Sequence, residues 1–241
     1  MVLKRIEETI GGKRCTLCGG LDAPFWLIQP VDQYDLEGLE AEAPHIEAMT
    51  ASPFCLAAFR VEDWDNDLTP WAWDAGELLR GRRFGDGAGR TLAFVERELL
   101  PWMRARRADC AGPRVLLGGY SLAGLFALWG GYASACFEGV AGVSPSVWYV
   151  NWTDFAQKNA MKARYVYLSQ GDREARGRGP MGTADQAIRR QYRLLGGESN
   201  PRCALEWNPG NHFREPDLRT AKGFAWLMNR ISGEADGHQS G

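Results

Sequence analysis

The chain has 241 residues, of which 45% are hydrophobic and 24% are charged, so its composition is that of an ordinary globular protein and excludes disorder over most of its length. Its 28 basic and 30 acidic residues give a formal net charge of −2, which leaves no basic excess for binding a nucleic-acid backbone. We expect a single domain over residues 1–231, followed by a disordered tail over residues 232–241.

Short apolar runs alternate with helical patterns along the chain. The apolar runs predict strands over residues 25–29, 54–59, 115–118, 140–143, 165–169 and 203–207. Apolar residues at helical spacing predict helices over residues 91–104, 122–134, 184–195 and 217–231. This alternation predicts an α/β protein with a mostly parallel central sheet and helices on both faces. Functional residues are then expected at the carboxyl ends of the strands.

Three features bear on location, membranes and metals. The N-terminus has no apolar signal segment, so a cytoplasmic location is expected. The uncharged residues 115–137 are long enough to span a bilayer, but their glycines favour a buried strand, a turn and a helix, and we expect no membrane association. Cys15 and Cys18 form one CxxC pair without a second, so we expect a turn there, free and mostly buried thiols, and no metal.

A serine stands between a predicted strand and a predicted helix. Residues 118–124 read GGYSLAG, and the small residues Gly119 and Ala123 lie two positions before and after Ser121. Small residues there let the strand and the helix approach, so that a serine can be held on a sharp turn with its hydroxyl exposed. The N–H of Leu122 would then point towards a developing oxyanion. The alternative is a buried glycine-rich crossing with an ordinary serine.

Only three histidines compete for the role of general base. His45 lies far upstream of Ser121 in a polar segment, and His238 lies in the tail. His212 follows the last predicted strand and precedes the last predicted helix, which is where the base lies in hydrolases with the chain order serine, acid, histidine. We therefore predict Ser121 as nucleophile and His212 as base, with a solvated loop histidine as the alternative.

The acid and the second oxyanion donor are less clearly indicated. Asp172 and Glu174 both follow strand 165–169, and either carboxylate could orient the imidazole of His212. The spacing does not choose between them, and a dyad without an acid is a further alternative. The second oxyanion donor should lie in the loop after an early strand. Because strand 54–59 leads into Arg60 and Val61, we predict the N–H of Arg60, or that of Val61, for this role.

The run from Gly118 to Leu128 resembles the nucleophile elbow of the esterase family of α/β-hydrolases that includes enterobactin and other trilactone esterases and S-formylglutathione hydrolases. The resemblance continues at residues 144–146, 171–174 and 210–213, which read SPS, GDRE and GNHF, and touches most of residues 50–230. It implies an α/β-hydrolase fold, hydrolysis of a small-molecule ester through an acyl-enzyme, and no cofactor. In trilactone-type members the Gly-x-x-Glu stretch looks like the one that carries the acid, which favours Glu174 over Asp172.

Tryptophans follow two strands whose ends should lie near the serine. We predict that Trp64 and Trp148 line a substrate pocket, which would suit an acyl or aryl ester, although such rings can also simply pack loops onto the domain. The predicted function is that of a serine carboxylic ester hydrolase. The alternatives are an acyltransferase, in which an alcohol replaces water, and a non-catalytic binding protein of the same fold. The intact set of serine, histidine and carboxylates argues against the binding protein, and nothing in the sequence indicates an oligomeric state.

Overall fold

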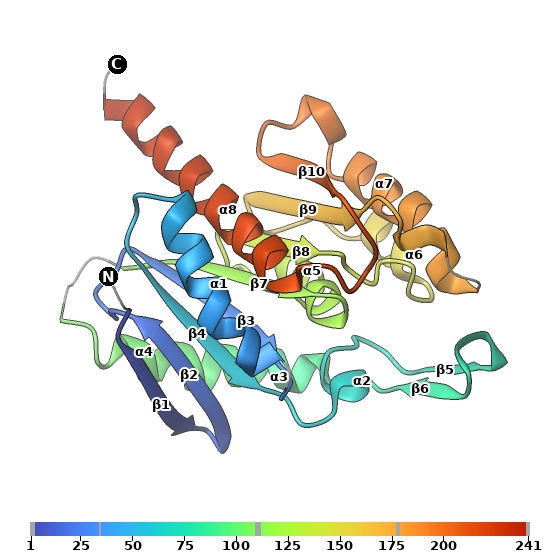
Figure 1. Cartoon of the computed structure of the whole chain (residues 1–241), viewed down its shortest axis with the longest axis horizontal. Helices are drawn as coiled ribbons and strands as arrows, with labels where there is room; N and C mark the ends of the chain where they lie inside the picture. Colours follow the sequence, from blue (N-terminus) through green and yellow to red (C-terminus); the bar gives the residue numbers. More distant parts are fainter. Residues whose placement is uncertain (1–2, 34, 109–111, 177–178, 240–241) are drawn as a thin grey trace.

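The computed structural model describes residues 3–33, 35–108, 112–176 and 179–239. Within them, the main sheet has eight strands in the order β1-β2-β4-β3-β7-β8-β9-β10 (Figure 1). Their bounds are β1 Arg5–Ile10, β2 Lys13–Gly19, β3 Phe25–Val31, β4 Phe54–Arg60, β7 Arg114–Tyr120, β8 Gly139–Val143, β9 Tyr165–Gly171 and β10 Cys203–Asn208. Strand β2 pairs with both of its neighbours in the antiparallel sense. The other neighbours in the sheet, in the order β4-β3-β7-β8-β9-β10, pair in parallel.

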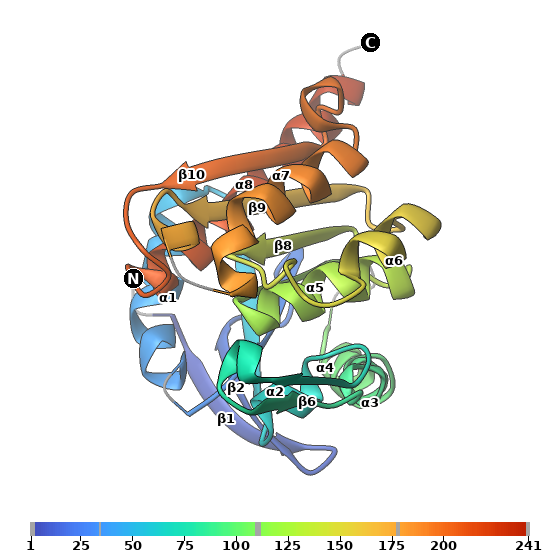
Figure 2. The same cartoon turned by 90° about the vertical axis from the view of Figure 1, so that its right-hand side faces the viewer.

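Helices cover both faces of this sheet (Figures 1 and 2). On one face, α1 (Asp35–Met49) and α8 (Pro216–Gln239) pack against each other. The helices whose side chains join the core of the other face are α3 Ala88–Phe94, α4 Leu100–Arg104, α5 Leu122–Ala133, α6 Trp152–Lys158 and α7 Ala184–Leu194. The predicted architecture, a mostly parallel sheet between two helical layers, is confirmed.

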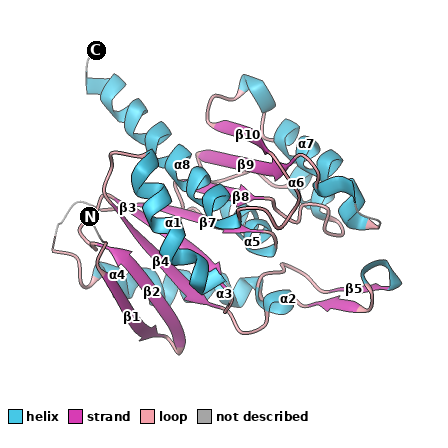
Figure 3. Cartoon of the chain, in the orientation of Figure 1, coloured by secondary structure: helices cyan, strands magenta, loops and turns pink. Residues whose placement is uncertain are grey.

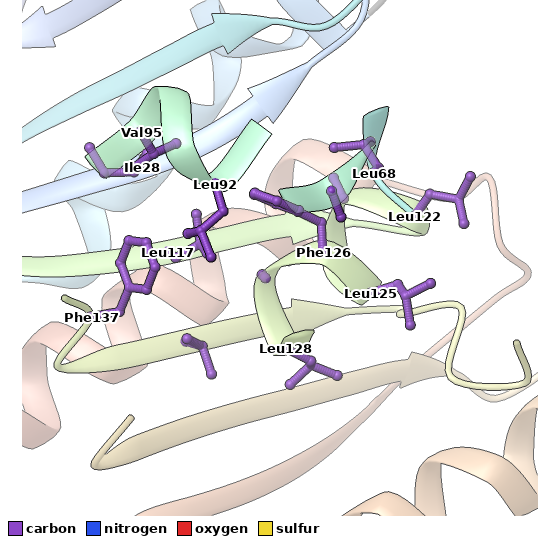
Figure 4. Close-up of a cluster of buried hydrophobic side chains, with 14 of the residues drawn as sticks. Ile28, Leu68, Leu92, Val95, Leu117, Leu122, Leu125, Phe126, Leu128 and Phe137 are labelled. Atoms are coloured by element: carbon purple, nitrogen blue, oxygen red, sulfur yellow. The ribbon is translucent and has the colours of Figure 1, made fainter. Parts of the chain in front are cut away.

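The two faces of the sheet form two hydrophobic clusters. Successive strand residues point to opposite faces, so Leu27 joins the cluster under α1 and α8 while Ile28 joins the other. Figure 4 shows part of that second cluster, where the fully buried Leu117 of β7 and Phe126 of α5 lie among other buried side chains. Burial of both elements in one cluster fixes β7 against α5, and therefore fixes the turn that joins them.

The strands and helices predicted from apolar patterns are present, with small differences at their ends. The largest difference lies in residues 91–104, where a short π-helical segment, Val95–Leu99, separates α3 from α4. Pro101 follows this segment and has no N–H for the preceding helical carbonyl, which accounts for the break in the regular pattern. Residues 115–137 form β7 and α5, and no helix in the described part of the chain has the length and apolar character needed to cross a bilayer.

The CxxC pair lies in a strand, and the predicted turn there is wrong. Cys15 and Cys18 both belong to β2, and an odd spacing along a strand sends their side chains to opposite faces of the sheet. They therefore cannot bond to each other or share a metal. Burial raises the pKa of Cys15 to about 11, which keeps its thiol protonated. Cys110 lies outside the described residues, and the other cysteines are free.

The terminal helix is longer than predicted. Helix α8 continues to Gln239, so residues 232–239 of the expected disordered tail are helical. Two side chains just beyond Ile231 explain the extension. Ser232 shares a hydrogen bond of 3.1 Å with Ser52, and Glu234 accepts one of 2.8 Å from the hydroxyl of Tyr165. Glu234 also forms an ion pair with Arg164.

A two-stranded hairpin projects beyond the carboxyl ends of the main strands (Figure 3). It consists of β5 (Trp73–Gly76) and β6 (Arg82–Phe84) and follows the short helix α2 (Trp64–Asp67). Its base is held by aromatic packing, since Trp73 stacks on Phe84 and meets the ring of Tyr149 edge-on. The hydroxyl of Tyr149 donates a hydrogen bond of 2.7 Å to the carbonyl of Trp71. These contacts tie the hairpin to the loop that follows β8.

Candidate active site

Ser121 occupies a strained turn between β7 and α5. Its φ of 57° and ψ of −117° lie in a region that residues other than glycine rarely adopt. Two backbone hydrogen bonds hold the turn: Ser121 donates to the carbonyl of Val143 at 3.0 Å, and Ser146 donates to the carbonyl of Ser121 at 3.1 Å. Although Ser121 precedes a helix, its hydroxyl makes no capping bond, which leaves the hydroxyl for another partner.

The small residues around Ser121 are required because the strand and the helix almost touch. A Cβ atom added to Gly119 would lie 2.6 Å from the Cβ of Ala123 and 2.8 Å from its carbonyl oxygen. A Cβ atom added to Gly124 would lie 2.9 Å from the carbonyl oxygen of Gly119 and 3.0 Å from that of Val143. The close approach that the GGYSLAG pattern predicts is therefore present in the structure.

Ser121, His212 and Glu174 form a chain of hydrogen bonds. The Nε2 atom of His212 lies 3.0 Å from Oγ of Ser121, and Nδ1 lies 2.8 Å from Oε2 of Glu174. The histidine and glutamate side chains are 19% and 5% exposed. A carboxylate on Nδ1 favours the tautomer in which Nε2 can accept the serine proton. The arrangement can therefore support nucleophilic attack by the serine with base assistance.

The carboxylate of Glu174 has further donors on its other oxygen. Oε1 accepts hydrogen bonds from the hydroxyl of Ser144 at 2.7 Å, the N–H of Gly171 at 2.7 Å and the guanidinium of Arg219 at 3.1 Å. Burial favours the neutral acid, but the hydrogen bonds from His212, Ser144 and Gly171 outweigh it and hold the pKa of Glu174 below its usual range. Glu174 is thus a carboxylate at neutral pH and can stabilise positive charge on the imidazole.

Asp172, the other candidate acid, does not reach the imidazole. Its side chain is 55% exposed and lies 3.5 Å from the guanidinium of Arg173. It accepts a hydrogen bond of 2.8 Å from the N–H of Gly210. That bond fixes the backbone just before His212 and leaves the imidazole itself to Glu174. Of the two carboxylates that the spacing left open, the structure brings only Glu174 to the imidazole.

Leu122 lies where the sequence predicted an oxyanion donor. It is the first residue of α5, so its N–H belongs to the first turn, whose donors have no carbonyl partner within the helix. The positive end of the helix dipole adds to the attraction for negative charge at this position. The N–H of Leu122 therefore has no carbonyl partner within the helix and lies directly after Ser121 in the chain.

The order of the strands argues against Arg60 as the second oxyanion donor. Strand β3 pairs directly with β7, whose end carries Ser121, whereas β4, which ends at Arg60, lies on the far side of β3. Neighbouring strands lie about 4.8 Å apart, so the end of β4 is roughly 10 Å from the end of β7. The N–H of Val61, also considered, donates to the carbonyl of Val31 at 3.0 Å.

The connection after β3 is the nearer source of a donor. Pro30 and Val31, at the end of β3, line the same cavity of about 240 Å³ as Gly119 and Tyr120 at the end of β7. The backbone that begins at Asp32 thus leaves the sheet beside the nucleophile turn. The strand order argues against Arg60, and the sequence does not reveal the order in which β3 and β4 enter the sheet.

The two predicted pocket tryptophans differ in their surroundings. Trp148 lines a cavity of about 340 Å³ between the loop after β8 and helices α6 and α7, and its ring meets that of Trp73 at 6.4 Å. Trp64 begins α2 and packs, half-buried, against the hydrophobic cluster that contains Ile28 and Leu117. Trp71 also packs a loop, since it donates a hydrogen bond of 3.0 Å to the carbonyl of Val150. Only part of the tryptophan excess is therefore in a position to line a pocket.

A larger cavity borders the site on the hairpin side. It measures about 800 Å³ and is bounded by the hairpin and by Glu174, Gly179 and Met181. Its walls combine apolar side chains with arginines: Leu78, Leu79 and Met181 beside Arg80 and Arg82. Leu78 is 63% exposed.

Three side chains of the site were not predicted: Tyr120, Arg219 and Ser144, the last described above as a donor to Glu174. Tyr120, within the GGYSLAG motif, donates a hydrogen bond of 2.9 Å from its hydroxyl to the carbonyl of His212. Its position next to Ser121 was the available signal. Arg219 donates to the hydroxyl of Tyr120 at 3.1 Å, but an arginine on a terminal helix carries no sequence signal, since such side chains are mostly exposed. Within the described residues, no group of three or more His, Cys, Asp and Glu side chains is arranged to hold a metal ion.

Comparison with known proteins finds similarity in structure and not in sequence. Neither a family model nor a curated protein sequence matches the chain. An IroE-like serine hydrolase from Shewanella oneidensis superposes with a TM-score of 0.68 at 14% identity, over 94% of this chain and 80% of that one. A siderophore hydrolase from Aspergillus nidulans superposes with a TM-score of 0.68 at 17% identity, over 90% of both chains.

An enterobactin esterase from Shigella flexneri is also similar, with a TM-score of 0.65 at 15% identity, over 96% of this chain and 60% of that one. At identities this low, the structural similarity establishes the fold alone. The chain has the α/β-hydrolase fold. The fold that the motif resemblance implied is therefore confirmed.

The turn geometry makes a testable prediction about Gly119. Replacing Gly119 with alanine forces Cβ against the backbone of Ala123, so we expect Gly119→Ala to lower the free energy of unfolding by about 1–3 kcal/mol, measured by chemical denaturation. The control is Gly89→Ala in α3, where an added Cβ meets nothing within 4 Å and alanine should be neutral or stabilising. Equal stability of the two variants would contradict the proposed crowding.

Proposed function

We propose that the chain is a serine esterase that hydrolyses a carboxylic ester through an acyl-enzyme on Ser121. The observation that carries this proposal is the unbroken hydrogen-bond chain from Ser121 through His212 to Glu174, with the serine on a strained turn at a helix start. The similar folds belong to proteins described as serine hydrolases and esterases, which supports the same class of reaction.

In the first half-reaction, Oγ of Ser121 attacks the ester carbonyl while Nε2 of His212 takes its proton. Glu174 holds the imidazole through Nδ1 and stabilises the imidazolium that forms. The carbonyl oxygen gains negative charge, which the N–H of Leu122 and a donor from the β3–α1 connection stabilise, each donor contributing on the order of 10²–10³ in rate. The imidazolium returns the proton to the alcohol oxygen as the carbon–oxygen bond breaks, leaving the acyl group on Ser121.

In the second half-reaction, water takes the place of the alcohol. His212 removes a proton from water, the oxygen attacks the acyl carbonyl, and the same donors hold the second oxyanion. Collapse of this intermediate breaks the bond to Ser121, whose oxygen receives the proton back from the imidazolium. The products are a carboxylic acid and an alcohol, and no cofactor takes part.

The substrate proposed is a small-molecule ester with an apolar acyl or aryl group. Trp148 lies two residues after Ser146, whose N–H holds the carbonyl of Ser121, and it lines the cavity between the loop after β8 and helices α6 and α7. The ring offers a flat apolar wall to an acyl chain. Trp64 remains a weaker candidate for the same role, because its ring packs against the hydrophobic cluster.

Replacing the nucleophile tests the reaction directly. We expect Ser121→Ala to lower kcat/KM for p-nitrophenyl esters by at least about 10⁴-fold, because the attacking oxygen is gone while the fold is kept. The measurement is paired with labelling by a fluorophosphonate, located by mass spectrometry. Absence of both turnover and labelling in the wild-type protein would refute the esterase proposal.

The two carboxylates provide a matched pair of variants. Glu174→Gln removes the charge opposite the imidazole and should lower kcat by roughly 10³–10⁴-fold, since the wrong imidazole tautomer is then favoured. Asp172→Asn keeps an oxygen that can accept from the N–H of Gly210, so we expect kcat within about threefold of wild type. Comparable losses in both variants, measured on one p-nitrophenyl ester, would argue against the role given to Glu174.

The cavity beside Trp148 makes a prediction about chain length. Trp148→Ala removes the apolar wall of this cavity. The ratio of kcat/KM for p-nitrophenyl hexanoate to that for the acetate should therefore fall by roughly tenfold. The control is Trp102→Ala on α4, whose ring is covered by the guanidinium of Arg106 at 3.9 Å and lies on no cavity described above. A preference that is unchanged in Trp148→Ala would remove this residue from the substrate site.

A further inference from the structure

A buried arginine connects three parts of the candidate active site. Arg219 belongs to α8, and its side chain is 2% exposed. Its guanidinium donates to Oε1 of Glu174 at 3.1 Å, to the hydroxyl of Tyr120 at 3.1 Å and to the carbonyl of Pro209 at 3.0 Å. A buried cation needs a counter-charge, and the one that Arg219 contacts is the carboxylate already bonded to His212.

We propose that Arg219 is a positioning residue that holds the acid, the histidine loop and the nucleophile turn in register, and whose charge sets the acidic limit of activity at Ser121. This proposal rests on the proposed function of the same site. It assigns to the terminal helix a role in the reaction that goes beyond covering the sheet.

The contacts of the guanidinium explain the positioning part. Tyr120 directly precedes Ser121, Pro209 opens the loop that carries His212, and Glu174 follows β9. The hydroxyl of Tyr120 accepts from Arg219 and donates to the carbonyl of His212, so the guanidinium also reaches the histidine backbone through one hydroxyl. Segments from three distant parts of the chain are thus fixed against one planar group.

The shared carboxylate explains the charge part. The guanidinium lies on Oε1 of Glu174 and the imidazole lies on Oε2, so both cations use the same negative charge once the imidazole is protonated. The fixed positive charge of Arg219 repels the charge that the imidazole gains when it takes a proton. Removing the charge should therefore move the acidic limb of the rate profile to higher pH.

Other charged groups near Arg219 are already paired among themselves. On the sheet face below α8, Tyr167 of β9 donates to Glu206 of β10, and Glu206 also binds Lys222, one turn along α8. On the other side of Glu174, Asp172 lies against Arg173, and Asp185 interacts with Arg189 in α7. None of these groups bonds to both the acid and the histidine loop. Arg219 is therefore the cation whose removal should be felt at the imidazole.

The test compares two neutral variants, Arg219→Met and Arg219→Gln, with the charged variant Arg219→Lys. The readout is the second-order rate constant for fluorophosphonate labelling of Ser121 as a function of pH, with folding checked by circular dichroism. We expect the neutral variants to label about tenfold more slowly at neutral pH, and their acidic midpoint to rise by about half a pH unit or more. Arg219→Lys keeps the charge and should keep the wild-type midpoint.

Two further variants separate charge from position. Arg214→Met removes an exposed arginine from the same loop, where solvent screens the charge, so its midpoint should equal that of wild type. Tyr120→Phe removes the hydroxyl that contacts Arg219, Ser144 and the carbonyl of His212 but keeps the charge of Arg219, so its labelling should be several-fold slower with no change in midpoint. This variant keeps the positioning part testable even where both neutral variants of Arg219 fail to fold.

The outcomes are distinct. A folded neutral variant with the wild-type midpoint, or a lysine variant shifted as far as the neutral ones, would overturn the role of the charge. Tyr120→Phe with the wild-type rate would overturn the positioning role. Both results require that wild-type Ser121 is labelled. If it is not labelled, the proposed esterase function itself has failed, and the two failures can thus be told apart.

Discussion

The candidate site depends on one buried carboxylate, that of Glu174. Moving a charge out of water costs several kcal/mol unless hydrogen bonds replace the lost solvation. Here the donors come from the loop after β8, the end of β9, the histidine loop and α8: Ser144, Gly171, His212 and Arg219. Each of these groups must lie within about 3 Å of one carboxylate. The need to solvate Glu174 therefore also fixes the relative positions of four separate segments.

A second constraint acts at the nucleophile and has a steric origin. Gly119 and Gly124 lie so close to neighbouring backbone atoms that no side chain fits at either position. This proximity brings the first turn of α5 next to Ser121, where its N–H groups and dipole can act on an oxyanion. The strained φ of Ser121 is the conformational cost of the turn, and burial of β7 and α5 in one hydrophobic cluster offsets it.

The sequence predicted those parts of the fold and site whose residue types are constrained locally. The GGYSLAG turn requires small residues at set positions, and His212 follows the last strand, so both could be recognised without a structure. Strand β1 was missed because its exposed edge residues interrupt the apolar pattern, and β2 because its CxxC pair was interpreted as a turn. Helix α1 was missed because Pro44 lies within a polar helix. The strand order that argues against Arg60 depends on contacts between distant segments, which local patterns do not encode.

Arg219 shows most clearly why part of the site escapes sequence reasoning. On a helix at the end of the chain, an arginine is normally a solvated surface residue, and no neighbour in the sequence suggests otherwise. Its role arises only when α8 packs over the ends of β7 and β9, which brings Tyr120 and Glu174 under the helix. A lysine could supply the charge there. The planar fork of arginine is needed to donate at the same time to a carboxylate, a hydroxyl and a carbonyl lying in different directions.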